Sequence, residues 1–446
     1  AYASQTGFAE ELAQRTAAML QAGAVPVRLT GLDALAPSTL AASHRALFVV
    51  STTGEGDAPD SAAAFVRKVM GGSIRLGGLE YGLLALGDTS YAAYCAFGRQ
   101  LDAWLRAQGA RPLFDRIEVD AAAPDALRHW QTQVEMLAGA AAEGIDLAAP
   151  EEFLPWRLVE REALNPDGIG APVYRLAFTP LHGPADWQAG DIAVLAPRNA
   201  PATVTEALER AGLSGAFAET LATRQLPSDP SELRGLSPAA LSEALPPLPR
   251  RDYSIASTPA SGRLELLVRQ VRLPDGRFGL GSGWLTEHVP IGGEVALRLR
   301  VNQSFRAPDQ DAPMILIGNG TGIAGLRAHL QARLCAGRRR NWLLFGERSR
   351  ARDFLCGAEI EAWLAAGDLA RLDLAFSREE PRRYVQDALR AAAPELRRWV
   401  AEGAVILVCG SLQGMAPAVQ AVLQEELGVE ALEELVAAGR YRRDVY

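Results

Sequence analysis

The sequence predicts a multidomain α/β protein in which two doubly wound parallel sheets flank an antiparallel β-barrel. Three observations lead to this prediction. The chain has 446 residues, too many for one ordinary core, which suggests about three domains. Short apolar runs alternate with helical patterns in the first and last thirds of the chain. The middle third is instead rich in short β-type segments separated by turns.

In the first third, apolar strands are predicted at 46–50 and 81–86, each followed by a helical pattern. The helices are expected at 9–21, 62–70, 97–108 and 125–142. This alternation is typical of a parallel sheet covered by helices. Residues 140–155 are rich in Ala, Glu and Pro, which indicates a linker. We therefore place the first domain at 1–146 and the linker at 147–155.

In the middle third, β-type segments are predicted at 173–178, 192–195, 264–271 and 294–301. They favour an antiparallel barrel over 156–310, interrupted by a Pro- and Ser-rich helical insertion at about 200–249. From 311 to 446 the alternation of strands and helices returns, which predicts a second doubly wound domain. Its strands are expected at 314–317, 341–345, 371–376 and 405–408.

Composition narrows the class of protein. The apolar fraction of 48% and the charged fraction of 22% are those of soluble globular proteins. The net charge of -8 argues against nucleic acid and favours a protein partner with a basic face. The four cysteines lack metal or disulfide spacing, so we expect no metal site and a reducing, cytoplasmic location. The chain begins just before a phosphate-loop pattern that should follow a full strand, so we expect an upstream segment, in which a membrane anchor could lie.

Three polar or glycine-containing loops follow strands of the first third. Because the carboxyl ends of parallel strands form the ligand-binding edge of a sheet, we expect these loops to meet. The first loop opens a helix, where hydroxyls and backbone N–H groups can hold a phosphate without a cation. Each loop alone could be an ordinary βα turn, whereas the three together predict a ligand site. The candidate residues are Ser4, Gln5, Thr6, Gly7, Phe8, Ala9, Ser51, Thr52, Thr53, Gly54, Leu86, Gly87, Asp88, Tyr91, Tyr94 and Cys95.

These loops resemble the flavodoxin-like domain of the diflavin reductases, and the third loop is nearest to that of the sulfite reductase flavoprotein subunit. The resemblance implies an FMN site in which Gly54 and Gly87 let the backbone approach the flavin and Tyr91 stacks on it. Two residues depart from the family. Phe8 replaces a small polar residue, and Thr53 replaces the stacking aromatic of NADPH-haemoprotein reductases. We therefore expect an aromatic side chain on only one face of FMN.

The run Arg251-Asp252-Tyr253-Ser254 resembles the R-x-Y-S pattern of ferredoxin-reductase-like barrels. The resemblance implies an FAD site, with Arg251 on the pyrophosphate, Tyr253 stacked on the flavin and Ser254 close to its N5. Without the resemblance, the aromatic and the hydroxyl could equally be a core residue and a cap. A helix expected at 284–288 is preceded by a loop that would place pyrophosphate at the helix N-terminus. Its residues are Gly279, Leu280, Gly281 and Ser282.

A glycine-rich loop containing Gly320, Thr321 and Gly322 follows the strand at 314–317 and opens a helix, which is the context of a dinucleotide-binding loop. The family usually has proline at positions 319 and 325, where this chain has asparagine and glycine. A downstream cluster resembles the family's site for the adenosine 2′-phosphate, for which guanidinium is the natural partner, and this favours NADPH over NADH. The alternative is a solvated Arg-rich loop. The cluster consists of Ser377, Arg378, Arg382, Tyr384 and Gln386.

The C-terminal segment 440–446 resembles the end of the sulfite reductase flavoprotein subunit. The resemblance implies that Cys409 lies near the nicotinamide and that Tyr446 covers the flavin face that nicotinamide must reach. Taken alone, Cys409 would be a small buried apolar residue. With Ser254 and Asp444, these two residues are the predicted catalytic residues.

The resemblance covers the whole chain and implies an NADPH-dependent diflavin oxidoreductase, an electron-transport flavoprotein. Electrons would pass from NADPH through FAD and FMN to a separate acceptor, a sulfite reductase haemoprotein or another haem or metal protein. The main departure is between residues 191 and 251, where relatives insert a large helical connecting domain and this chain has a short stretch. Two alternatives stay open: a flavin-binding interaction or sensor module without turnover, and the cytoplasmic reductase portion of a membrane-anchored protein.

Overall fold

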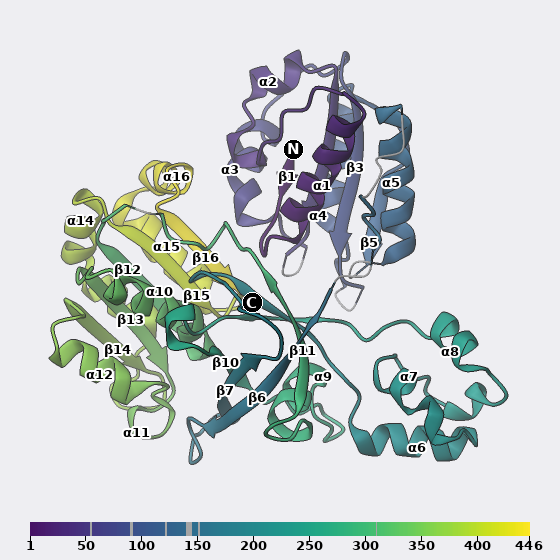
Figure 1. Cartoon of the computed structure of the whole chain (residues 1–446). Helices are drawn as coiled ribbons and strands as arrows, with labels where there is room; N and C mark the ends of the chain where they lie inside the picture. The colour runs from purple at the N-terminus through teal and green to yellow at the C-terminus, as the bar shows by residue number, and fades with distance from the viewer. Residues whose placement is uncertain (54–55, 90–91, 121–122, 140–144, 150–151, 309) are drawn as a thin grey trace.

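The computed structural model describes residues 1–53, 56–89, 92–120, 123–139, 145–149, 152–308 and 310–446. Three sheets follow one another along the chain (Figure 1). The first and third are five-stranded and parallel, and the second is six-stranded and antiparallel. This arrangement confirms the predicted multidomain α/β fold. We refer to each sheet with its covering helices as the first, second and third module.

The first module is a parallel sheet between two helical layers. Its strands are β1 (Tyr2–Ala3), β2 (Arg45–Ser51), β3 (Glu80–Gly87), β4 (Arg111–Pro112) and β5 (Ile117–Asp120). Its helices are α1 (Phe8–Ala22), α2 (Pro37–Ala42), α3 (Ala63–Phe65), α4 (Ala96–Ala107) and α5 (Pro124–Ala138), with short turns η1 (Leu32–Ala34) and η2 (Asp60–Ala62). Apolar residues of α1 and α5 share one core, and those of α3 and α4 share another. The single helix expected at 62–70 is instead divided into η2, α3 and the π-helical turn η3 (Val66–Met70).

The second module is built on strands in the order β10-β7-β6-β11-β8-β9. These are β6 (Leu154–Ala163), β7 (Val173–Pro180), β8 (Ile192–Ala196), β9 (Arg251–Ser254), β10 (Leu264–Arg269) and β11 (Glu294–Arg300). Between β10 and β11 the chain forms the short helix α9 (Leu280–Gly283) and the π-helical turn η7 (Trp284–His288). The two edge strands meet through one bridge, Ile255 to Leu266, where the Ala256 N–H donates to the Glu265 carbonyl at 2.8 Å. The sheet thus curls on itself, and within the described residues β9 and β10 do not form the continuous ladder of a closed barrel.

The expected insertion folds into α6 (Pro201–Ala211), α7 (Ala218–Ala222) and α8 (Pro238–Ala244). Its buried apolar residues form a small core of their own, separate from that of the curled sheet. Figure 1 shows the three helices projecting to one side, away from the first module. The insertion therefore lies apart from the junction between the first and second modules.

The third module has the strand order β14-β13-β12-β15-β16. The strands are β12 (Met314–Asn319), β13 (Asn341–Glu347), β14 (Arg371–Phe376), β15 (Val405–Gly410) and β16 (Tyr441–Val445). The helices are α10 (Ile323–Cys335), α11 (Arg350–Asp353), α12 (Gly357–Ala365), α13 (Val385–Ala391), α14 (Ala393–Ala401), α15 (Met415–Leu427) and α16 (Val429–Ala437). The C-terminal segment thus pairs with β15 as the edge strand of the sheet, which the sequence analysis did not assign.

The first residues of the predicted linker pack against the first module. Leu147 and Ala148 are 2% and 9% exposed and pack in the core of the first module. The Leu147 N–H also donates to Gln131 Oε1 of α5 at 2.7 Å. At the other end, β6 begins at Leu154. Apolar residues at both ends of the expected linker therefore belong to the flanking modules, a property that composition alone did not reveal.

The longest described helices, α1 and α5, have 15 residues each. In the part of the chain that the structure describes, no helix has both the length and the apolar composition needed to cross a membrane.

Because the first module has its own cores, we expect residues 1–149 expressed alone to fold and to bind FMN but not FAD. A matched fragment that ends at residue 146 lacks two buried side chains, and loss of the buried Leu147 should cost about 1.5–3 kcal/mol of unfolding free energy. Urea unfolding and analysis of bound flavin test both points. FAD in the fragment, or equal stability of the two fragments, would contradict the assignment.

Candidate flavin and coenzyme sites

The carboxyl ends of β2 and β3, with the segment between β1 and α1, border a cavity of about 340 Å³. The predicted residues that line it are Ser4, Thr6, Phe8, Ser51, Thr52, Leu86, Gly87, Asp88, Tyr94 and Cys95. Gly54 and Tyr91 lie outside the described residues. The three predicted loops therefore meet at one cavity, as the position of ligands in parallel sheets requires.

The segment that opens α1 fits a phosphate group. Gly7 adopts φ of +90°, and its N–H donates to Ser4 Oγ at 2.9 Å, which turns the backbone into the helix. As the N-cap residue, Gly7 offers no side-chain cap, so N–H groups of the first helical turn are available to an anion. On the opposite loop, Thr52 Oγ1 is buried and has no hydrogen-bond partner among the described residues. A ligand with a phosphate and a polar ring edge would satisfy both groups.

Four predicted residues of these loops do not line the cavity. Gln5 turns away to Asp60, from which its side-chain oxygen accepts the N–H at 3.0 Å. Ala9 is fully buried in the core. Gly7 packs against the second module, and the Thr53 hydroxyl donates to carbonyl groups of its own loop at 3.3 and 3.4 Å. These residues shape the loops, and the predicted direct contact of each with a ligand stays a prediction.

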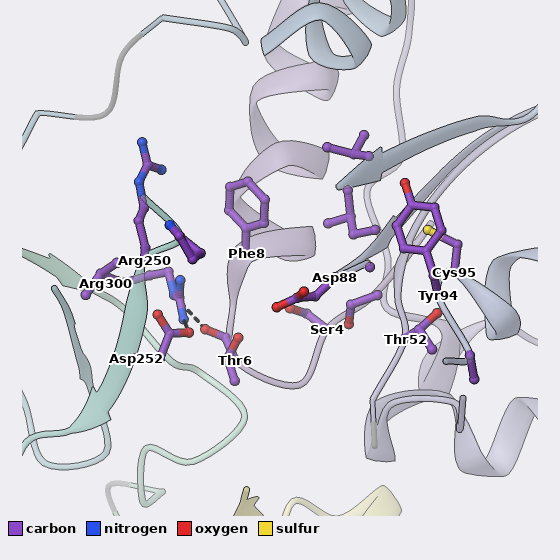
Figure 2. Close-up of a pocket in the computed structure, with 17 residues that line it drawn as sticks. Ser4, Thr6, Phe8, Thr52, Asp88, Tyr94, Cys95, Arg250, Asp252 and Arg300 are labelled. Atoms are coloured by element: carbon purple, nitrogen blue, oxygen red, sulfur yellow. Dashed lines mark hydrogen bonds and ion pairs between the residues drawn. The ribbon is translucent and has the colours of Figure 1, made fainter. Parts of the chain in front are cut away.

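Gly87 is required by the packing of the third loop. A Cβ at this position would lie 2.7 Å from Tyr94 Cδ2 and 2.8 Å from the Cys95 backbone nitrogen. The loop therefore crosses directly over Gly87, and this crossing brings the Tyr94 ring to the cavity (Figure 2). Packing alone therefore requires glycine at position 87, and the approach of a flavin to it stays a prediction.

The second module forms the opposite wall of the cavity. Figure 2 shows Arg250, Asp252 and Arg300 facing the first module, with Phe8 standing between the two walls. Arg300 pairs with Asp252, and its Nε donates to the Thr6 carbonyl at 2.8 Å. Asp252, predicted as an FAD contact, thus borders the first cavity. Strand β9 consequently lies between the two predicted flavin sites.

The two sequence motifs assigned to FAD lie against each other. A Cβ on Gly281 would lie 2.8 Å from Tyr253 Oη and 2.8 Å from Arg251 Cγ. Ser282 Oγ accepts the Val271 N–H at 3.1 Å, which fixes the loop that begins α9. The glycine loop is therefore packed on β9 closely enough for both motifs to serve one ligand.

Three predicted catalytic side chains meet at the seam between the second and third modules. Ser254 Oγ donates to Asp444 Oδ2 at 2.6 Å, and Cys409 Sγ lies 3.8 Å from the same oxygen. Ser254 ends β9, whereas the other two lie on β15 and β16, so this cluster exists only when the modules are packed together. Gly325 of α10 closes the cluster, because a Cβ there would lie 3.4 Å from the thiol sulfur.

The seam is a low-dielectric site. Asp444 is 4% exposed, and burial raises its pKa above the ordinary value, although the hydrogen bond from Ser254 acts in the opposite direction. Burial, followed by the neighbouring Asp444, raises the pKa of the Cys409 thiol well above its ordinary range. Cys409 therefore remains a neutral thiol rather than a thiolate nucleophile.

A second cavity, of about 550 Å³, lies at the carboxyl ends of the strands of the third module. Gly320 adopts φ of +56° where the backbone turns into the following helix. Tyr446 is 56% exposed, and its hydroxyl lies 3.4 Å from Thr321 Oγ1, so the terminal ring stands at the mouth of the glycine loop. The predicted residues that line this cavity are Gly320, Thr321, Ser377, Tyr384, Gln386 and Tyr446.

Gly322, Arg378 and Arg382, also predicted to bind coenzyme, do not line this cavity. A Cβ on Gly322 would lie 2.1 Å from the carbonyl oxygen of Cys409, so this glycine permits close packing of the helix start on β15. Arg378 and Arg382 are exposed on the loop after β14. Direct contact of these three residues with the coenzyme stays a prediction.

Sequence reasoning missed three arginines that do line the cavity: Arg269, Arg348 and Arg383. Arg269 comes from β10 of the second module, and its Nη2 donates to Glu347 Oε1 at 2.9 Å. Only the three-dimensional packing of the modules brings Arg269 here. Arg383 directly follows Arg382, and no sequence signal distinguished which of the two neighbours lines the cavity.

The comparisons with known proteins agree with this organisation. Residues 1–130 match the family described as Flavodoxin, and residues 316–421 match the family described as Oxidoreductase NAD-binding domain. The fold and both cavities thus define a flavoprotein oxidoreductase with a flavodoxin-like domain and a nicotinamide-coenzyme domain.

Full-length similarity specifies the family. The chain is 30% identical to the sulfite reductase [NADPH] flavoprotein alpha-component of Vibrio cholerae serotype O1 over 532 positions, covering 100% of this chain and 87% of the relative. It is also 30% identical to the Klebsiella pneumoniae alpha-component, covering 89% of that protein. The chain belongs to the family of sulfite reductase [NADPH] flavoprotein alpha-components. It is an NADPH-dependent flavoprotein reductase whose cofactors are FMN, FAD and NADPH.

The raised pKa of Asp444 predicts the effect of Asp444→Asn on stability. A carboxyl group whose pKa is raised in the folded protein costs stability when it ionises, and this cost is absent below the ordinary pKa. The variant should therefore have a higher Tm than the parent near neutral pH, by about 2–4 °C for each 1 kcal/mol regained. The difference should shrink as the pH falls toward the ordinary Asp value. Thermal unfolding across pH tests this, and a lower Tm at neutral pH would contradict it.

Proposed function

We propose that the chain accepts hydride from NADPH at FAD and passes electrons singly through FMN to a separate redox protein. FAD would allow the change from two-electron to one-electron transfer, and the protein determines the sequence of the transfers and the orientation of the cofactors. The observation that carries the proposal is the position of β9. Its Ser254 end belongs to the seam beside the coenzyme cavity, and Asp252 of the same strand borders the cavity of the first module.

At the seam, Asp444 would stabilise the positive charge that develops on a nicotinamide ring as hydride departs. A buried carboxylate is effective in this role because little water screens it. Ser254 holds this carboxylate through its 2.6 Å hydrogen bond, and the neutral Cys409 thiol fills the space beside it. These three residues and Tyr446 are the proposed catalytic set.

For the coenzyme, we assign the 2′-phosphate to Arg383 and Arg348, with Ser377, Tyr384 and Gln386 around them. All five residues line the coenzyme cavity. Arg269 would serve the pyrophosphate, because its Nη2 lies 3.2 Å from the position of a Cβ on Gly320 in the glycine loop.

The separate acceptor is a haem or metal protein, and a sulfite reductase haemoprotein is the candidate that the family resemblance implies. The alpha-components to which the chain is similar are named as flavoproteins of sulfite reductase. A membrane anchor upstream of Ala1 stays a prediction. Sequencing the full open reading frame tests it.

The purified protein should contain one FAD and one FMN and should oxidise NADPH in the presence of a one-electron acceptor such as ferricyanide. Sulfide formation with the haemoprotein component from the same organism tests the proposed acceptor. Flavin binding without any NADPH turnover would support the alternative of a sensor module.

Arg383→Ala should raise the Michaelis constant for NADPH by about tenfold or more and leave that for NADH nearly unchanged, because a lost charge-assisted contact costs about 1.5–3 kcal/mol. Arg378→Ala is the matched control on the same loop and should change neither constant by more than about twofold. Steady-state kinetics with both coenzymes measure the effect. A selective loss in Arg378→Ala would restore the assignment made from the sequence.

Tyr446→Ala should favour NADH relative to NADPH. Nicotinamide must displace the terminal ring, and NADH, which lacks the 2′-phosphate, has less binding energy with which to do so. Stacking is worth about 0.5–1.5 kcal/mol beyond burial, so the preference ratio should shift by roughly several-fold to tenfold toward NADH. Stopped-flow bleaching of FAD with each coenzyme measures the ratio. An unchanged ratio would show that Tyr446 does not gate the site.

A further inference from the structure

Strand β16 faces two different sites. Successive side chains of a strand point to opposite faces. Asp444 belongs to the seam and Tyr446 to the coenzyme cavity, whereas Arg443, which directly precedes Asp444 and so points to the opposite face, reaches the first module. Arg443 Nε donates to Asp60 Oδ2 at 2.8 Å, and a second guanidinium nitrogen contacts the other carboxylate oxygen. This bidentate ion pair therefore joins the first module to the strand that completes the hydride site.

Asp60 is in turn attached to the segment that fits the FMN phosphate. Gln5 Nε2 donates to Asp60 Oδ2 at 3.1 Å, and the Asp60 N–H donates back to Gln5 Oε1 at 3.0 Å. The neighbouring Ser61 hydroxyl donates to the Ser4 carbonyl at 3.1 Å. A displacement of Arg443 would consequently be felt at the phosphate segment through one intervening side chain.

The same segment also makes close contacts with the second module. Arg300 Nε donates to the Thr6 carbonyl at 2.8 Å, and Ser304 Oγ donates to the Gln5 carbonyl at 2.9 Å. A Cβ on Gly7 would lie 2.5 Å from the Val301 carbonyl oxygen, so the backbones touch directly. The phosphate segment is therefore also the docking surface of the first module.

Charge complementarity holds this surface in register. Arg298 pairs with Glu11 of α1 at 2.5 Å, and Glu433 of α16 pairs with Arg67 and with Lys68, the latter at 3.3 Å. Arginines of the second and third modules thus pair with acidic residues of the first module. At Glu433 the charges are exchanged, because the acid belongs to the third module and the cations to the first. Mixed signs of this kind fix one docked orientation and disfavour others.

We propose that Arg443 is a positioning residue for electron transfer from FAD to FMN, because its ion pair with Asp60 sets the docked position of the first module. The inference rests on the proposed function, which requires the two flavins to face each other across this junction. The short insertion α6–α8 projects away from the first module, so the docked orientation depends on this pair and its neighbours (Figure 1). Since β16 also carries Asp444 and is directly followed by Tyr446, docking and hydride delivery share one segment.

The test uses the holoenzyme with both flavins and compares Arg443→Gln with Arg442→Gln. Arg442 is the matched control, because it donates to the Gly439 and Gln303 carbonyls, outside the first module. In anaerobic stopped-flow with NADPH, Arg443→Gln should keep the rate of FAD reduction within about twofold and slow the transfer to FMN by roughly tenfold or more. Arg442→Gln should leave both phases near the parent values.

A second measurement reports docking without any redox step. Small-angle scattering at low salt should give a larger radius of gyration for Arg443→Gln than for the parent or for Arg442→Gln. Added salt should expand the parent toward the variant, because it screens these ion pairs. The exchange Asp60→Arg with Arg443→Asp should recover most of the transfer rate and the compact form, whereas either single reversal should lose both.

Several results would overturn the proposal: equal slowing of both kinetic phases, equal behaviour of the two glutamine variants, or no recovery in the exchanged pair. If Arg443→Gln fails to fold, Asp60→Asn, which alters the pair from the other side, gives the same comparison. Failure of the proposed function is distinguishable, because NADPH would then not reduce FAD in the parent protein, while the scattering comparison would still report docking.

Discussion

The hydrogen bond from Ser254 to the buried carboxylate of Asp444 is the constraint on which the arrangement of the reductase depends. It joins the end of β9 to the C-terminal strand, across two modules that also share one apolar core, in which Ala256 and Leu267 pack with Leu316. A carboxylate that is 4% exposed requires a partner, and this one finds it only when the second and third modules are packed together. The hydride site is thus a property of the seam and belongs to neither module alone.

The packing at the seam also explains how the first module can dock although the connecting segment of this chain is short. The alignments with relatives are 532 and 534 positions long, whereas this chain has 446 residues, so the relatives carry segments that this chain lacks. In this chain β9 and β16 lie at the seam, Asp252 of β9 borders the cavity of the first module, and Arg443 of β16 binds Asp60 of that module. The strands that form the hydride site therefore also supply part of the docking surface for the FMN-binding module.

Much of this organisation follows from the sequence, because strand and helix periodicities and glycine positions are local signals. The apolar run at 314–317 and its glycine loop predicted the third module, and three loops predicted the first cavity. Features set by packing could not be predicted in this way. Arg269 reaches the coenzyme cavity from another module, Arg383 rather than Arg382 lines that cavity, and Leu147 is buried although it follows a linker-like composition. The pairing of β16 likewise depends on a distant strand.

The most direct test of the account is reduction by NADPH of protein selectively depleted of one flavin. The account places hydride transfer at the seam between the second and third modules and makes the first module a recipient. Protein depleted of FMN should therefore have its FAD reduced by NADPH at a rate close to that of the complete protein. In protein depleted of FAD, NADPH should leave FMN oxidised. Rapid reduction of FMN in the FAD-depleted protein would contradict the account, because hydride would then reach the first module without passing through the seam.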